Sequence, residues 1–189
     1  MINTALQFTK EMLDQFLRNR YNLDESKVLL NCLIESNGQV PQINQNKVVI
    51  SLINLEKETL KPFYVRNQKM VNGNYAEVSP SERYNLMVLI SANFDDYSET
   101  LKFLDAVILF FQMNPSLDVH SSANIPAGLN KLEYEIEKIT YHQMQGLWTA
   151  MGAKYQPSVI YKTRLVTVHG GETDGFTPGI VSTETVAMT

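Results

Sequence analysis

Apolar residues near the start of the chain recur at intervals of three and four positions. They are Ile2, Ala5, Leu6, Met12, Leu13, Phe16 and Leu17. This spacing predicts an amphipathic helix, because it places these side chains along one helical face. Thr4, followed three residues later by Gln7, predicts a capping box at the start of that helix.

Two further helices are predicted, over residues 96–113 and 140–150. In the first, DYSETLKFLDAVILFFQM, apolar residues nearly encircle the axis, so we expect it to be largely buried. Both helices carry residues that mark their ends. These residues are Asp96 with Glu99, Asn114-Pro115, Thr140 with Gln143, and Gly152.

The segments between the helices have the composition or the alternation of β-strands. Residues 27–34 and 47–58 are rich in β-branched side chains, and residues 83–94 alternate between apolar and polar positions, which predicts one buried face. Residues 132–139 alternate as well, and residues 158–169 form a long β-branched run after a proline. All five segments are therefore predicted strands.

The order of these elements predicts an α/β (α+β) fold, in which a mixed β-sheet is flanked by about three helices. Residues 59–80 fit either a hairpin or an excursion loop, with a turn at Asn72-Gly73. Residues 114–131 are predicted to be a loop.

The composition changes near His169. The last twenty residues hold three of the chain's twenty carboxylates, none of its sixteen Lys and Arg, and four of its nine glycines. This change predicts a folded domain over residues 1–169 and a Gly/Thr-rich acidic C-terminal arm over residues 170–189. The β-branched end of the arm, IVSTETVAMT, fits strand addition to a neighbour's sheet, and the alternative is a frayed tail.

Charge and cysteine content exclude several classes of protein. The 189 residues carry a net charge of −4, which argues against a nucleic-acid-binding surface. The single cysteine, Cys32, excludes an internal disulfide and is expected to be an inert core residue in a strand. The longest apolar run, residues 106–111, is too short to cross a bilayer. With no secretion signal at the start, we expect a soluble protein made in the cytoplasm, without direct membrane insertion.

No catalytic motif is visible in the sequence. Asp95-Asp96 is the nearest approach to a catalytic carboxylate pair, but its place before a predicted helix favours capping. His120, His142 and His169 have no partners at metal-ligand spacing. We therefore expect no catalytic, cofactor or metal site. The alternative is a small-molecule-binding or hydrolytic α/β domain, with a pocket formed by Asp95, Asp96 and His120.

Charged residues occupy one face of each of the last two predicted strands. Glu133, Glu135 and Glu137 share a face of the first, and Lys162 and Arg164 share a face of the second. Paired across strands, such charges contribute about 0.2–1 kcal/mol each. Paired across subunits, they would instead help to set the docking register.

Four blocks of the sequence stand together in a characteristic order. They are residues 1–17, 48–58, 84–112 and 139–168. The most specific passages are I-S-A-N-F…Y…L-K-F-L over residues 90–104 and L-W-x-A-M-G-A-K-Y-x-P-S-V-I-Y-K-x-R over residues 147–164. Together they resemble the cap, or tail-terminator, subunit of phage-tail-like contractile injection systems of the antifeeding-prophage type. The resemblance spans residues 1–169.

This resemblance implies a structural protein and not an enzyme. Family members form a hexameric ring on the last layer of the inner tube and sheath, and so end polymerisation at the end distal to the baseplate. The implied partners are further copies of the chain and the tube and sheath subunits of one particle, cytoplasmic or released. Ring closure needs a head-to-tail interface between two different faces. A monomeric adaptor that uses the acidic arm as a linear motif is a further alternative.

Interface candidates lie around the last predicted strand and in the arm. They are Lys154, Tyr155, Tyr161, Lys162, Arg164, Ile180, Val181 and Val186. Tyrosine and arginine are enriched at interface hot spots, although Tyr155 and Tyr161 fit the core equally well. Trp148 is expected to be a core residue.

Overall fold

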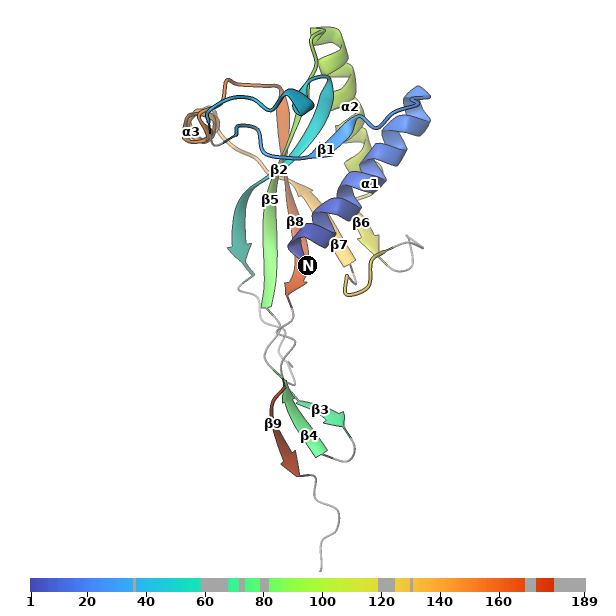
Figure 1. The fold of residues 1–189 in the computed structure, drawn as a ribbon, viewed down its shortest axis with the longest axis vertical. Helices are drawn as coiled ribbons and strands as arrows, with labels where there is room; N and C mark the ends of the chain where they lie inside the picture. Colours follow the sequence, from blue (N-terminus) through green and yellow to red (C-terminus); the bar gives the residue numbers. More distant parts are fainter. Residues whose placement is uncertain are drawn as a thin grey trace, which may run out of the picture.

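A six-stranded mixed sheet is the centre of the fold in the computed structural model (Figure 1). The structure describes residues 1–35, 37–58, 68–71, 74–78, 82–118, 125–129, 131–168 and 173–178. The strands, in their spatial order, are β1 (Val28–Leu30), β2 (Lys47–Lys57), β5 (Glu82–Asn93), β8 (Ser158–Val168), β7 (Lys131–Ile136) and β6 (Ser116–Asp118). Only the β1–β2 pair is parallel among these, so the expected α+β class with a mixed sheet is confirmed.

Helices cover both faces of this sheet. Helices α1 (Ile2–Tyr21) and α2 (Tyr97–Met113) lie on one side of the sheet, and α3 (Tyr141–Met151) lies on the other (Figure 1). A short 3₁₀ turn, η1 (Gln42–Asn44), precedes β2. The three helices match the three that the sequence predicts.

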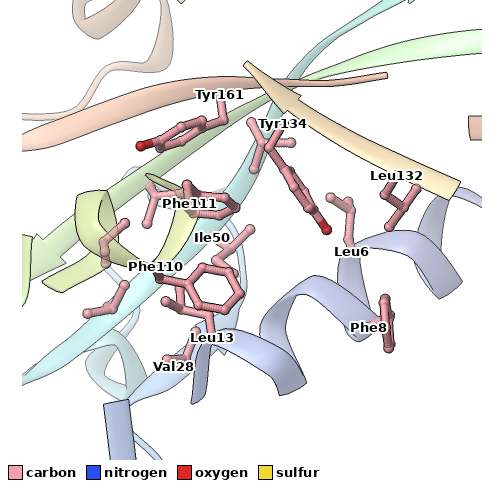
Figure 2. Packing of buried hydrophobic residues seen from close by; sticks show 14 of the residues in the cluster. Leu6, Phe8, Leu13, Val28, Ile50, Phe110, Phe111, Leu132, Tyr134 and Tyr161 are labelled. Atoms are coloured by element: carbon pink, nitrogen blue, oxygen red, sulfur yellow. The ribbon is translucent and has the colours of Figure 1, made fainter. Parts of the chain in front are cut away.

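The larger core lies between the sheet and the pair α1 and α2. Phe111 packs at its centre, with ring centroids 4.1 Å from Tyr161 and 5.0 Å from Tyr134. Figure 2 shows Tyr134 directing its hydroxyl from β7 toward α1. There it lies 2.7 Å from the Thr9 hydroxyl, which itself donates to the Ala5 carbonyl, so Tyr134 is the donor to Thr9. Burial raises the pKa of Tyr134, because the tyrosinate would lose its hydration.

A smaller core lies under α3. Trp148, only 4% exposed, packs there with Val49, Leu89 and Ile160 from three adjacent strands. The neighbouring residues along β5, Val88 and Ile90, point into the other core. Strand β5 is therefore buried on both faces, whereas its alternation in the sequence predicted one buried face.

The ends of α2 and α3 are capped as the sequence predicts. Asp96 is the N-cap of α2 and accepts a hydrogen bond of 2.9 Å from the Ser98 amide. Thr140 and Gln143 form a full capping box on α3. Gly152 ends α3 with a φ of 66°, the left-handed conformation that glycine adopts without strain. These local signals were sufficient to set the helix boundaries.

A separate three-stranded sheet contains β3 (Gln68–Val71), β4 (Asn74–Val78) and β9 (Thr173–Pro178). Val71 pairs with Asn74 across an antiparallel register, so the hairpin alternative holds here; Asn72 and Gly73 themselves lie outside the described residues. Strand β9 belongs to the predicted arm and pairs with β4 of the same chain. The domain boundary at His169 stays a prediction.

Several predictions near the N-terminus were wrong. Helix α1 begins at Ile2 with Met1 as its N-cap, so Thr4 lies inside the first turn and forms no capping box. The strand predicted over residues 27–34 ends at Leu30, and Cys32 follows it as an exposed residue. The chain turns away because β1 is an edge strand of only three residues, and Cys32 therefore leaves the core.

Two apolar side chains and one predicted loop also differ from expectation. Ile136, predicted to face the core, is 55% exposed, and Leu101 on α2 is 46% exposed. Helix α2 is thus buried on one side only, because α1 and the sheet cover only part of its circumference. The predicted loop over residues 114–131 contains the short edge strand β6.

The packing predicts a large difference between two substitutions on α2. Phe110→Ala removes a ring that is 2% exposed and should lower the free energy of unfolding by about 3–5 kcal/mol. Leu101→Ala changes a half-exposed side chain on the same helix and should cost less than about 1 kcal/mol. Urea denaturation followed by circular dichroism measures both, and equal losses would contradict the assignment of the core.

Candidate interaction surfaces

The face of the sheet that carries α3 has two parts. Helix α3 covers one part, and a ladder of charged side chains crosses the other. This charge ladder consists of Glu56, Glu58, Lys131, Glu133, Glu135, Lys162 and Arg164. They share a face because alternate residues of β2, β8 and β7 point to the same side of the sheet.

The charges of the ladder pair with one another inside the chain. Arg164 lies 3.7 Å from Glu58 and 3.8 Å from Glu135, and Lys162 lies 3.5 Å from Glu56. Glu135 is also directly opposite Lys162 in the strand register. The predicted cross-strand pairing is therefore confirmed, and pairing of these charges across subunits stays a prediction.

An apolar groove lies beside α3. Its volume is about 530 Å³, and its apolar lining comes from Ile139, Tyr141, Met144, Trp148, Ala153 and Tyr155. Trp148 is confirmed as a core residue, and its ring is 5.6 Å from that of Tyr155 in an edge-on contact. Tyr141 is 96% exposed and Tyr155 is 63% exposed. We call this feature the α3 groove.

The structure separates the interface candidates into three groups. Lys154 and Tyr155 are exposed beside the α3 groove. Lys162 and Arg164 are partly exposed members of the charge ladder. Tyr161 is 4% exposed against Phe111, so the prediction that it lies at the surface was wrong and the core alternative holds.

The three candidates in the arm, Ile180, Val181 and Val186, lie outside the described residues.

The carboxylate pair gives no support to a catalytic pocket. Asp96 caps α2, and Asp95 is exposed and accepts hydrogen bonds from the amides of Asn46 (3.0 Å) and Gln45 (3.2 Å). These hydrogen bonds lower the pKa of Asp95 because they favour the ionised carboxylate, and the bond from Asn46 has the larger effect. A general acid would need a raised pKa. His120 lies outside the described residues.

The described part of the chain offers neither a metal site nor a membrane-spanning helix. No group of three or more His, Cys, Asp or Glu residues there is placed to hold a metal ion. Within the same ranges, no helix has the length and apolar character needed to span a membrane.

The sequence did not reveal the α3 groove, although it held a signal. Helix α3 has no Asp, Glu, Lys or Arg in its eleven residues, yet most of its positions are exposed. An uncharged exposed helix is unusual on a protein surface, where charged residues predominate. The lack of charged residues can be seen in the sequence, but the exposure of these positions is known only from the structure.

Two solved structures share this architecture. One is described as the PVC sheath/tube terminator, in the extended state, of an extracellular contractile injection system. The alignment covers 100% of this chain and 64% of the terminator chain, with a TM-score of 0.67 and 16% identity. The other is described as the anti-feeding prophage tube terminating cap. The alignment covers 95% of this chain and 60% of the cap chain, with a TM-score of 0.59 and 11% identity. The chain thus spans less than two thirds of the length of either protein.

The fold is therefore the α+β fold of tail terminators, as the resemblance implied. The family model of the Pvc16 N-terminal domain matches residues 9–182, which is most of the chain. The chain belongs to this family. No curated protein sequence matches it significantly.

The hydrogen bonds of Asp95 predict its response to a substitution at Asn46. Asn46→Gly removes the amide while keeping a residue that accepts the positive φ of 55° at this position. The pKa of Asp95 should rise toward its ordinary value of 3.8, as measured by carboxyl-carbon NMR. A lowered pKa of Asp95 in the folded state stabilises the fold at pH values above the pKa of the unfolded state, and this stabilisation disappears as the pH falls. The variant should therefore lose less stability than the parent protein below about pH 4. Asn37→Gly is the matched control, and a shift there of equal size would contradict the assignment.

The charge ladder predicts a rescue by charge exchange. Arg164→Glu places a third carboxylate near Glu58 and Glu135 and should lower the free energy of unfolding by about 1 kcal/mol. The double variant Arg164→Glu/Glu135→Arg should recover part of this loss, and urea denaturation measures it together with Arg164→Glu and Glu135→Arg alone. If the double variant is as unstable as the sum of its single variants, the pair does not interact.

Proposed function

We propose that this protein is a structural cap, or tail terminator, of a contractile injection system. In this proposal, copies of the chain close into a six-membered ring on the last layer of the inner tube and sheath. The ring ends their growth at the end distal to the baseplate. The observation that carries the proposal is the match of residues 9–182 to the Pvc16 N-terminal domain family.

The geometry supports a role in contact and not in catalysis. Asp95 and Asp96, the nearest approach to a catalytic carboxylate pair in the sequence, are engaged with loop amides and a helix N-terminus. The groove of about 530 Å³ beside α3 has mainly apolar side chains and no carboxylate among its lining residues. Such a surface is suited to binding protein side chains.

The partners follow from the two structural relatives. Both are described as terminators of a tube, and one also of a sheath. In our proposal this protein contacts the tube and sheath subunits of its own particle, which is assembled in the cytoplasm and stays there or is released. Its contact with them is through protein surfaces, without nucleic acid, cofactor or insertion into a membrane.

Mass photometry of the purified protein, together with a polymerisation assay, tests this function. We expect a species of about six copies. We also expect that adding it to growing tubes or sheaths stops elongation at one end, as seen by negative-stain electron microscopy. A heat-unfolded sample is the control for nonspecific blocking. A protein that stays monomeric at every concentration and leaves polymer lengths unchanged would refute the proposal.

A further inference from the structure

Helix α2 exposes an apolar stripe to solvent. Tyr97, Leu101, Leu104 and Ile108 follow one another at three- and four-residue spacing along one side of the helix. Tyr97 is 65% exposed and Leu101 is 46% exposed, while Leu104 and Ile108 are half-buried. We call these four residues the α2 stripe.

The α2 stripe and the α3 groove lie on opposite sides of the sheet. Helix α2 packs on the face that holds Val88 and Ile90, and α3 packs on the face that holds Leu89 (Figure 1). One chain therefore cannot bring its own stripe into its own groove. A head-to-tail ring needs two different surfaces of the same subunit to face two neighbours, and this arrangement supplies such a pair.

The segments that carry the two surfaces have opposite net charge. Residues 95–113 contain four carboxylates and one cation, Lys102, which gives a net charge of −3. Residues 138–156 contain Lys138 and Lys154 and no carboxylate, which gives +2. Both lysines are exposed, and no described residue forms an ion pair with either of them.

We infer that the α2 stripe of one copy docks into the α3 groove of the next copy around the ring. The exposed side chains of Tyr97 and Leu101 enter the groove between Tyr141 and Tyr155, above the floor formed by Trp148. Lys138 and Lys154 face the acidic side of α2 that carries Asp105. This inference rests on the proposed ring and names the surfaces that close it.

Two variants disable the two surfaces separately. Leu101→Asp places a charge in the stripe, where it would be buried without a partner in the groove. Tyr141→Asp with Gln145→Glu places two carboxylates at exposed positions of the groove, where they repel the acidic side of α2. Neither variant touches a buried residue. Each alone should weaken self-association by about 30-fold or more and give monomers in mass photometry.

Mixing the two variants gives the sharper result. The stripe variant keeps an intact groove, and the groove variant keeps an intact stripe, so one junction between them can form. The second junction joins two altered surfaces and cannot form. We therefore expect a 1:1 heterodimer and no larger species. Leu55→Asp, at a leucine that is 41% exposed on β2, is the matched control and should still form rings.

The outcomes separate the inference from the function on which it rests. If the wild-type protein forms rings and either variant does too, the docking inference is overturned while the cap function stands. Monomeric variants that give no heterodimer on mixing, or a control that also loses the ring, overturn the inference as well. A wild-type protein that never assembles refutes the proposed function together with this interface. Circular dichroism melting confirms that each variant is folded.

Discussion

The structure depends on the burial of strand β5 on both of its faces. Val88 and Ile90 need the cover of α1 and α2, and Leu89 needs the cover of α3, because each apolar side chain left in water would cost about 1.5–3 kcal/mol. These requirements place helices on both sides of one sheet. They also set the relation between the outer surfaces of α2 and α3, which point away from each other.

The sheet extends beyond the part that α3 covers, and its uncovered surface is charged. The ladder that includes Arg164 and Glu135 pairs its charges within the chain, so it offers few unpaired charges to a partner. Among the described residues, the α2 stripe and the α3 groove are two apolar surfaces outside this charged face. Such a division keeps the charged face hydrated and leaves the apolar surfaces of α2 and α3 for contact, as the proposed ring requires.

Local signals explain which parts of the fold the sequence predicts well. The capping box at Thr140 and Gln143, the cap at Asp96 and the stop at Gly152 act within a few residues, and all three were predicted correctly. The failures needed distant information. Cys32 is exposed because β1 ends early at the edge of the sheet, and Tyr161 is buried because Phe111, fifty positions away, packs on it.

By itself, the sequence determined the three helices, five of the six strands of the main sheet and the family, because helix and strand periodicity, caps and long signature passages are properties of neighbouring residues. Only the tertiary structure decided which side of each element meets solvent. The pairing of Lys162 with Glu56 of β2 and of Arg164 with Glu58 just after β2, and the apolar surfaces of α2 and α3, depend on strands and helices that are far apart in the chain. Their positions follow from how the sheet is covered, which no local pattern contains.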